Sequence, residues 1–234
     1  MVYDVFPNGI AYNADCFEVM RELQSKSVDL VLTDPPYIVN TTGGGQSPLS
    51  RRARKVSRTL IDNNLTKGYD YRRAFCEFSR LCKTANILVF CSNQQIADTM
   101  QWFSTESMNP QLLVWRKTNP LPGNYLHYLS DTEYVVYARK RGATFNWKTL
   151  PLSSYSKVYT SPLVKGRHPN QKPMQFISNL IQIHSNEGDT VLDPFAGSGT
   201  TAIAASKLGR KFIVCEKDEA FYADMVKRIR EETA

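Results

Sequence analysis

Short apolar runs, rich in β-branched and aromatic residues, alternate along the chain with segments of helical periodicity. This alternation is typical of βαβ units built around a mostly parallel sheet. Several runs are apolar at almost every position, as expected for strands that helices cover on both faces. The fold class is therefore α/β. The pattern predicts strands at Val28–Thr33, Asn86–Cys91, Gln111–Trp115, Glu133–Tyr137, Thr190–Asp193 and Lys211–Glu216.

Helical periodicity fills several of the gaps between these strands. The segment Tyr71–Cys82, for example, places Phe75, Phe78 and Cys82 on one face. Helices are predicted at Tyr71–Cys82, Pro173–His184, Thr200–Leu208 and Glu219–Glu231. Two segments have neither the helical periodicity nor the apolar runs of strands. Residues 41–68, which contain three consecutive glycines, are predicted to form a loop, and residues 144–166 are predicted to be irregular.

Composition and charge limit the function classes. With 42% hydrophobic and 22% charged residues, the 234-residue chain is not of the disordered or fibrous type. Its 29 Lys and Arg against 22 Asp and Glu give a net charge of +7, which suits a polyanionic partner and equally serves solubility. No apolar run approaches membrane length and no signal peptide is recognised, so we expect a cytoplasmic protein without membrane contact. Five dispersed cysteines without a CxxC pair predict reduced thiols and no metal site.

A glycine-rich turn follows the strand at 190–193. Gly197 and Gly199 allow backbone N–H groups and a helix N-terminus to approach a ligand closely. The segment is neither a phosphate loop, because no lysine follows, nor a complete GxGxxG, because residue 202 is Ala. Glu216 ends the next strand, where a carboxylate accepts hydrogen bonds from a ribose; the alternative role, a helix cap, suits Asp218 better. A nucleoside cofactor is the predicted ligand.

The strand at 28–33 runs directly into the tetrapeptide Asp34-Pro35-Pro36-Tyr37. We expect this tip at the carboxyl edge of the sheet, where open α/β folds bind ligands. Asp34 and the Pro35 carbonyl can each accept one hydrogen of an exocyclic amino group, while Tyr37 stacks on the base. The candidate catalytic residues are thus Asp34, Pro35, Pro36 and Tyr37, and the alternative is a turn in which the aspartate is only a cap.

Residues 34–37 together with Asp193-Pro-Phe-Ala-Gly-Ser-Gly199 resemble the S-adenosylmethionine-dependent amino methyltransferases of DNA. The motif order resembles their beta group. The segment 13–16 is similar to a family segment whose acidic residue helps to hold the adenosine. Residues 168–173, His-Pro-Asn-Gln-Lys-Pro, are similar to the HPTQKP segment, which contacts the methionine part of the cofactor. The resemblance extends from about residue 8 to residue 230.

This resemblance implies a Rossmann-like class I methyltransferase fold, with a mostly parallel seven-stranded sheet and helices on both faces. It implies one methyltransferase domain over residues 1–234, with DNA-contacting insertions at about 41–70 and 120–168. The implied cofactor is S-adenosyl-L-methionine, converted to S-adenosyl-L-homocysteine without a metal. The implied cofactor contacts are Asp15, Cys16, Asp34, His168, Asn170, Lys172, Asp193, Phe195, Ala196, Gly197, Ser198, Gly199, Thr200, Glu216 and Lys217.

The implied reaction is methylation of adenine N6 in double-stranded DNA, on a base flipped out of the duplex. The resemblance also implies a bacterial or phage restriction-modification setting, and it raises a homodimer as an assembly to test. Basic side chains are candidates for phosphate contacts, with a solvated charged face as the alternative. They are Arg51, Arg52, Arg54, Lys55, Arg58 and Lys117.

Other functions remain in competition at this point. Cytosine-N4 methylation uses the same geometry, but there Ser or Thr commonly replaces the residue at Asp34. Protein glutamine methyltransferases usually begin the tetrapeptide with Asn and place it after the cofactor turn. A non-catalytic DNA-binding module would not need Asp34, Tyr37 and Glu216 intact, and a dinucleotide oxidoreductase would need a complete GxGxxG.

Overall fold

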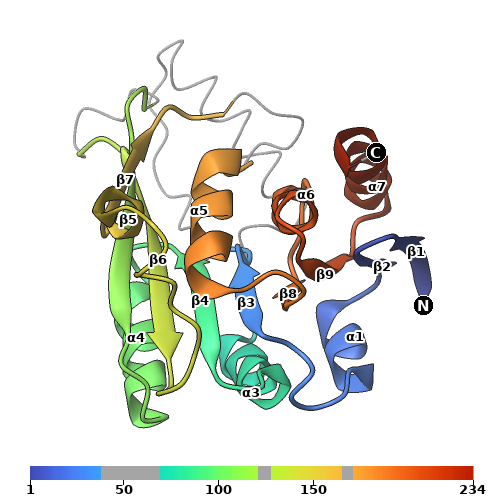
Figure 1. The fold of residues 1–234 in the computed structure, drawn as a ribbon, viewed down its shortest axis with the longest axis horizontal. Coiled ribbons are helices and arrows are strands. Elements are labelled where there is room, and N and C mark those ends of the chain that lie inside the picture. The colour runs from blue at the N-terminus through green and yellow to red at the C-terminus, as the bar shows by residue number, and fades with distance from the viewer. Residues whose placement is uncertain (38–68, 121–127, 165–170, 234) are drawn as a thin grey trace, which may run out of the picture.

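The computed structural model describes residues 1–37, 69–120, 128–164 and 171–233, and a single mixed sheet runs through them (Figure 1). Within these residues nine strands pair in the order β1-β2-β9-β8-β3-β4-β6-β5-β7. The strands are β1 Val2–Phe6, β2 Gly9–Asn13, β3 Leu30–Thr33, β4 Asn86–Cys91, β5 Gln111–Lys117, β6 Thr132–Arg139, β7 Val158–Ser161, β8 Thr190–Asp193 and β9 Lys211–Glu216.

The centre of the sheet, from β2 through β9, β8 and β3 to β4, is parallel. β6 runs antiparallel to both β4 and β5, β7 is parallel to β5, and β1 forms an antiparallel hairpin with β2. The mostly parallel sheet is thus confirmed. The expected number of seven strands is wrong, because the described residues alone form nine, with the hairpin strand β1 and the short strand β7 at the two edges.

Helices cover both faces of the sheet, with α5, α6 and α7 on one side and α1, α3 and α4 on the other (Figure 1). In β3, Leu30 and Leu32 pack into the core on the α5–α7 side, whereas Val31 packs into the core of the opposite face. This double burial is why the central strands are apolar at successive positions. The helices are α1 Cys16–Glu22, α3 Tyr71–Leu81, α4 Ile96–Thr105, α5 Met174–His184, α6 Thr200–Lys207 and α7 Glu219–Thr233.

All six predicted strands and all four predicted helices are present, with ends shifted by at most a few residues. β3 begins at Leu30 because Val28 makes only an isolated bridge, to Cys82. The predicted excursion at 144–166 contains a 3₁₀ turn, Leu152–Tyr155, and strand β7. The loop prediction for residues 41–68 lies outside the described residues.

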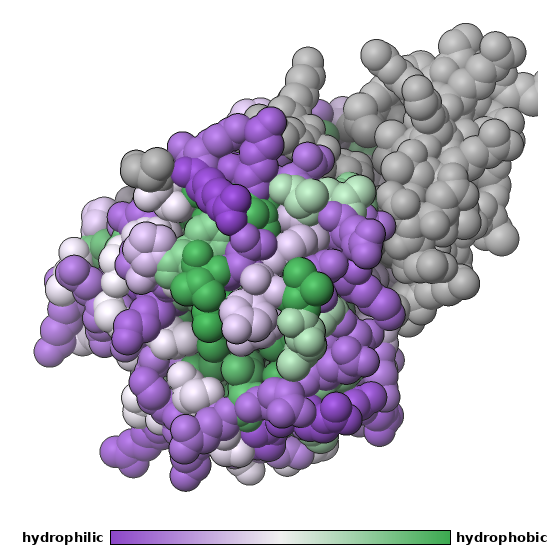
Figure 2. Space-filling model, turned by 90° about the vertical axis from the view of Figure 1, so that its right-hand side faces the viewer, coloured by the Kyte–Doolittle hydropathy of each residue, from purple (hydrophilic) through white to green (hydrophobic). Residues whose placement is uncertain are grey.

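The edge strand β1 was not predicted, and its burial explains why. Val2, Tyr3 and Val5 are each more than half exposed, so the run does not have the alternation of a half-buried strand. Figure 2 shows apolar residues gathered on the face of the molecule that carries β1 and α7. None of the helices within the described residues is long and apolar enough to cross a membrane.

Candidate active site

A cleft of about 1290 Å³ opens at the carboxyl edge of the parallel strands. It is lined by the tetrapeptide after β3, by the glycine turn after β8 and by Glu216 at the end of β9. Residues separated by some 160 positions therefore meet in one hollow, as the strand-end argument predicted. The volume is larger than the roughly 300–1,000 Å³ of a typical site for one small ligand.

A buried hydrogen bond joins the two motifs. The Thr33 hydroxyl, at the end of β3, donates to Asp193 Oδ1 over 2.7 Å, and the Phe195 N–H donates to the same oxygen over 3.2 Å. Burial raises the pKa of Asp193 to about 6, although these donors oppose the rise. Asp193 thus lies beneath the turn, where it fixes the turn against β3.

The glycine turn has the backbone conformation that its sequence requires. Gly197 and Gly199 both have positive φ, at 49° and 75°. A Cβ at Gly199 would lie 2.7 Å from Cγ of Met225 in α7, so any side chain there would clash as well as strain the backbone. Arg228 of α7 donates to the Ser198 carbonyl over 3.0 Å and to the Thr200 hydroxyl over 3.1 Å. The turn is therefore held from behind by α7.

Glu216 accepts hydrogen bonds from two turns. Its Oε2 accepts the Gly197 N–H over 3.0 Å and its Oε1 accepts the Asp218 N–H over 2.9 Å. Burial raises the pKa of this carboxyl group. The helix cap falls to Asp218, which accepts N–H groups of Ala220 and Phe221 at the start of α7. Glu216 is thus not a helix cap. It lines the cleft, and its carboxylate can accept further hydrogen bonds.

Asp15, Cys16 and Lys217 lie together on the rim of the cleft. Asp15 caps α1 by accepting the Phe17 N–H over 2.9 Å, and its other carboxylate oxygen pairs with Lys217 Nζ over 3.2 Å. The Cys16 thiol is buried, which raises its pKa to about 12. These three residues thus line the same cleft as the glycine turn and Glu216, and their contact with a cofactor stays a prediction.

Asp34 accepts hydrogen bonds from two side chains of the chain itself. The Tyr37 hydroxyl donates to Oδ1 over 2.7 Å, and the Lys172 ammonium donates to Oδ2. Burial raises the pKa of Asp34, and Lys172 opposes that rise. Since each carboxylate oxygen can accept two hydrogen bonds, Asp34 keeps the capacity to accept from a further donor.

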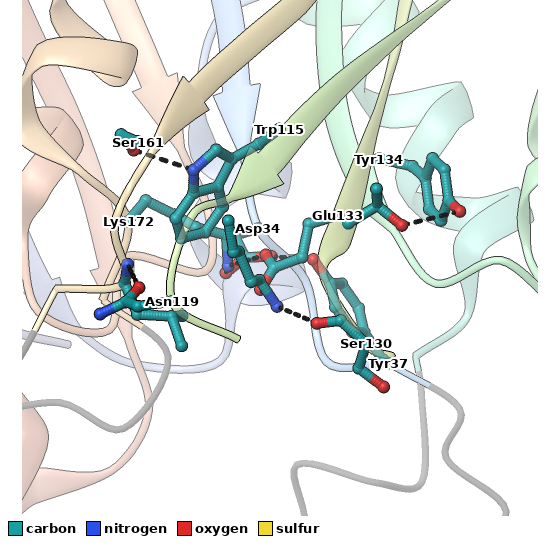
Figure 3. Close-up of polar contacts among 12 residues, drawn as sticks. Asp34, Tyr37, Trp115, Asn119, Ser130, Glu133, Tyr134, Ser161 and Lys172 are labelled. Carbon is teal, nitrogen blue, oxygen red and sulfur yellow. Dashed lines mark hydrogen bonds and ion pairs between the residues drawn. The ribbon is translucent and has the colours of Figure 1, made fainter. Parts of the chain in front are cut away.

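Two more residues extend this contact into a network that the sequence did not predict (Figure 3). Glu133 of β6 lies 3.2 Å from Lys172 Nζ through its Oε2 and 2.8 Å from Lys117 Nζ through its Oε1. The available signal in the sequence was a charged residue, Glu133, directly before the apolar part of β6. Lys117, predicted as a phosphate contact, lies in the cleft, and its DNA role stays a prediction.

Other predicted positions have mixed outcomes. Lys172 contacts Asp34, whereas the resemblance implied a contact with the cofactor. Trp115, the last residue of the predicted strand at 111–115, is a core residue whose indole N–H donates to Ser161 Oγ over 2.9 Å. Among the described residues no group of three or more His, Cys, Asp or Glu side chains could hold a metal ion. His168, Asn170, Arg51, Arg52, Arg54, Lys55 and Arg58 lie outside the described residues.

Comparisons with known proteins find a matching family and matching relatives. The profile of the N6/N4 methyltransferase family, described as DNA methylase, matches residues 28–227. The type II methyltransferase M2.LlaDCHI of Lactococcus lactis subsp. cremoris is 28% identical, over 95% of this chain and 89% of the relative. The type II methyltransferase M.HinfI of Haemophilus influenzae is 30% identical, over 93% of this chain and 67% of the relative.

Solved structures also match. The crystal structure of the M1.HpyAVI–SAM complex has a TM-score of 0.67 and 27% identity, covering 93% of this chain and 98% of that chain. The cytosine-N4-specific PvuII DNA methyltransferase has a TM-score of 0.74 at 15% identity, covering 98% of this chain and 92% of that chain. This second likeness concerns the fold alone.

Proposed function

The chain belongs to the N6/N4 DNA methylase family, and from that premise we propose that it transfers the methyl group of S-adenosylmethionine to N6 of adenine in double-stranded DNA. The observation that carries the proposal is the convergence of Asp34 and the glycine turn in one cleft. Such a transfer needs a site that binds the amino group next to a site that binds the nucleoside cofactor. In this structure the hydrogen bond from Thr33 to Asp193 joins the two sites.

The cofactor half of the cleft fits S-adenosylmethionine. Glu216 has acceptor capacity for ribose hydroxyls, Asp15 lies on the same rim, and the turn at Gly197 presents backbone rather than side chain. S-Adenosylmethionine, when bound, supplies an electrophilic methyl group. The M1.HpyAVI structure, solved as a complex with SAM, supports this choice. We propose no metal in the reaction.

On the target side, catalysis consists mainly of positioning. An aromatic amino group is a weak nucleophile because its lone pair is delocalised into the ring. Hydrogen bonds from the amino group to Asp34 and to the Pro35 carbonyl localise that lone pair and stabilise the positive charge that develops on nitrogen. The Tyr37 ring offers a stacking surface for a flipped base.

Lys172 does not receive the proton that the methylated amine releases. Burial lowers the pKa of Lys172, but the charges of Asp34 and Glu133 outweigh burial and raise it above its ordinary value. An ammonium group has no lone pair to accept a proton. The proton therefore passes to Asp34 or to water.

Adenine is preferred over cytosine because Asp34 begins the tetrapeptide, as in the adenine type that the sequence resembles. The fold does not discriminate, since a cytosine-N4-specific enzyme shares it. We further propose that the segments at about 41–70 and 120–168 contact DNA within one methyltransferase domain, with Arg51–Arg58 on the phosphates.

The proposal is tested by incubating the purified protein with isotopically labelled S-adenosylmethionine and unmethylated double-stranded DNA, followed by digestion to nucleosides and mass spectrometry. We expect label in N6-methyldeoxyadenosine, and none with the D34A variant. Label on cytosine N4 would overturn the base assignment while keeping the reaction type. Absence of label on genomic DNA from several sources would overturn the proposed activity.

A further inference from the structure

Four charged side chains, one buried and three half-buried, form a continuous series beside the target side of the cleft. Figure 3 labels three of them, Asp34, Lys172 and Glu133. Asp34, Lys172, Glu133 and Lys117 follow one another, with alternating sign, from the loop after β3, the segment before α5, β6 and β5. Lys172 is 6% exposed, and its ammonium group also lies 5.0 Å from the centre of the Phe90 ring. So deep a placement is unfavourable for an ammonium group unless partners compensate it.

We propose that Lys172 and Glu133 are positioning residues for methyl transfer: Lys172 holds Asp34 as an ionised acceptor, and Glu133 holds Lys172 and cancels its charge. The inference rests on the proposed function, whose target site it deepens. Neither residue is placed against the reacting atoms; both act through Asp34. Lys117, on the second oxygen of Glu133, completes a series of two positive and two negative groups with no net charge.

Charge balance matters here because the reaction moves positive charge. The methyl donor is a sulfonium, and positive charge develops on the amino nitrogen as the methyl group is transferred. With Asp34 as its only counter-charge, the Lys172 ammonium would cancel the negative charge that Asp34 offers to both. Glu133 lies within 3.2 Å of that ammonium and compensates it, so the pocket retains Lys172 without opposing the transfer.

The groups that face Asp34 come from every neighbouring element. Lys172 lowers the pKa of Asp34, and Tyr37 lowers it through its hydrogen bond, while burial and the charge of Glu133 raise it. Within the described parts of the chain, further ionisable neighbours are Asp193 after β8, Cys91 at the end of β4 and Tyr69 before α3. Removal of Lys172 should therefore raise the pKa of Asp34, and further removal of the Glu133 charge should lower it again.

The experiment uses the full chain as wild type and as K172M, E133Q and K172M/E133Q. Asp34 is titrated by ¹³C NMR of the carboxyl group in aspartate-labelled protein, assigned with D34N, and kcat is measured against pH. K83M is the control, because Lys83 pairs with Asp29 at the other end of β3 over 2.8 Å. Cofactor affinity is measured for every variant by calorimetry.

We expect the pKa of Asp34 to be highest in K172M, lower in the double variant, lower again in wild type and lowest in E133Q. At neutral pH, kcat of K172M should fall about tenfold or more, and the double variant should recover part of the loss. The acidic limb of the kcat profile should move to higher pH in K172M, and by a smaller amount in the double variant. K83M should leave both profiles unchanged.

Two results would overturn the proposal. One is an Asp34 titration that is the same in K172M as in wild type. The other is a double variant no better than K172M, as expected if the two residues only support the fold. Weaker cofactor binding by K172M with an unchanged Asp34 titration would instead assign Lys172 to the cofactor. Because the carboxyl titration needs no turnover, a wild-type protein without methylation would reject the proposed function separately from this network.

Discussion

The two halves of the cleft are held together by different kinds of group: backbone N–H groups on the cofactor side and charged side chains on the target side. On the cofactor side, backbone N–H groups of the glycine turn and of Asp218 bind Glu216, and α7 supports the turn from behind. On the target side, ionised side chains from four separate segments bind one another around Asp34. Substitutions that add atoms should therefore disturb the cofactor side most, and substitutions that change a charge should disturb the target side most.

The two halves also differ in how the sequence specifies them: one by a contiguous segment, the other by contacts between distant segments. The glycine turn is specified by a dozen consecutive residues, each with its own conformational preference. The charge series depends on strand order, because β6 lies between β4 and β5 and this brings Glu133 next to Lys172. Substitutions on the two sides should therefore fail in different ways.

The largest expected effect is on the target side. D34A removes the acceptor for the amino group, so the rate of methyl transfer should fall on the order of 10³-fold or more. Cofactor affinity should stay near the wild-type value, because the side chains that Asp34 binds in the described structure, Tyr37 and Lys172, are not part of the glycine turn. Single-turnover kinetics and titration calorimetry measure the two quantities.

D34A should still fold, since Lys172 retains Glu133 as its counter-charge. A variant with normal single-turnover rate would remove Asp34 from the mechanism. A variant that loses cofactor affinity and transfer together would show that the two halves are not separable in this way.

The next effect is on the cofactor side. G199A places a Cβ 2.7 Å from Met225 Cγ at a residue with φ of 75°. Strain and overpacking together should destabilise the protein by about 2–4 kcal/mol and weaken cofactor binding. Urea unfolding and calorimetry give the two values.

G142A is the matched control, because Gly142 also has positive φ but a Cβ there meets nothing within 4 Å. It should lose only about 1 kcal/mol, from backbone strain alone. The double variant G199A/M225A should recover the overpacking part. Equal losses in G199A and G142A would contradict the role given to α7 behind the turn.

How much the sequence could predict follows the same division. The strands with both faces buried, the tetrapeptide at 34–37 and the turn at 193–199 were found because each is a contiguous pattern. Helix α4 was missed because among its residues only Thr99 and Phe103 are buried, which leaves little apolar periodicity. The contact of Lys172 with Glu133 was not predictable, because no local pattern specifies which buried charges become neighbours once the sheet forms.

A third effect concerns pH, at the residue between the two halves. The folded pKa of Asp193 is about 6, above the ordinary 3.8, so the folded state holds this proton more tightly than the unfolded state. Asp193 therefore lowers the free energy of unfolding as pH rises from about 4 to 6. D193N has no such proton to lose, and its stability relative to wild type should increase over that interval by at most about 3 kcal/mol.

Urea unfolding of both proteins at intervals from pH 4 to pH 7 measures this difference. The gain of D193N should level off above pH 6, where wild-type Asp193 is ionised in both states. Parallel curves for the two proteins across the whole range would mean that burial does not perturb Asp193.

The smallest expected effect concerns the hydrogen bond between Thr33 and Asp193, which joins the two halves. Its removal tests whether cofactor binding or methyl transfer depends on that contact. T33V removes the hydroxyl that donates to Asp193 over 2.7 Å and leaves a side chain of nearly the same shape. Loss of this buried hydrogen bond should cost about 1–2 kcal/mol of stability, and T33S, which keeps the hydroxyl, should lose less. Urea unfolding measures both losses.

If the halves are held independently, as their different construction implies, T33V should lower cofactor affinity and the rate of transfer by less than tenfold each. A much larger loss of transfer at unchanged cofactor affinity would show that Asp34 depends on the glycine turn through Thr33, and the target side would then be less self-contained than its charge series suggests.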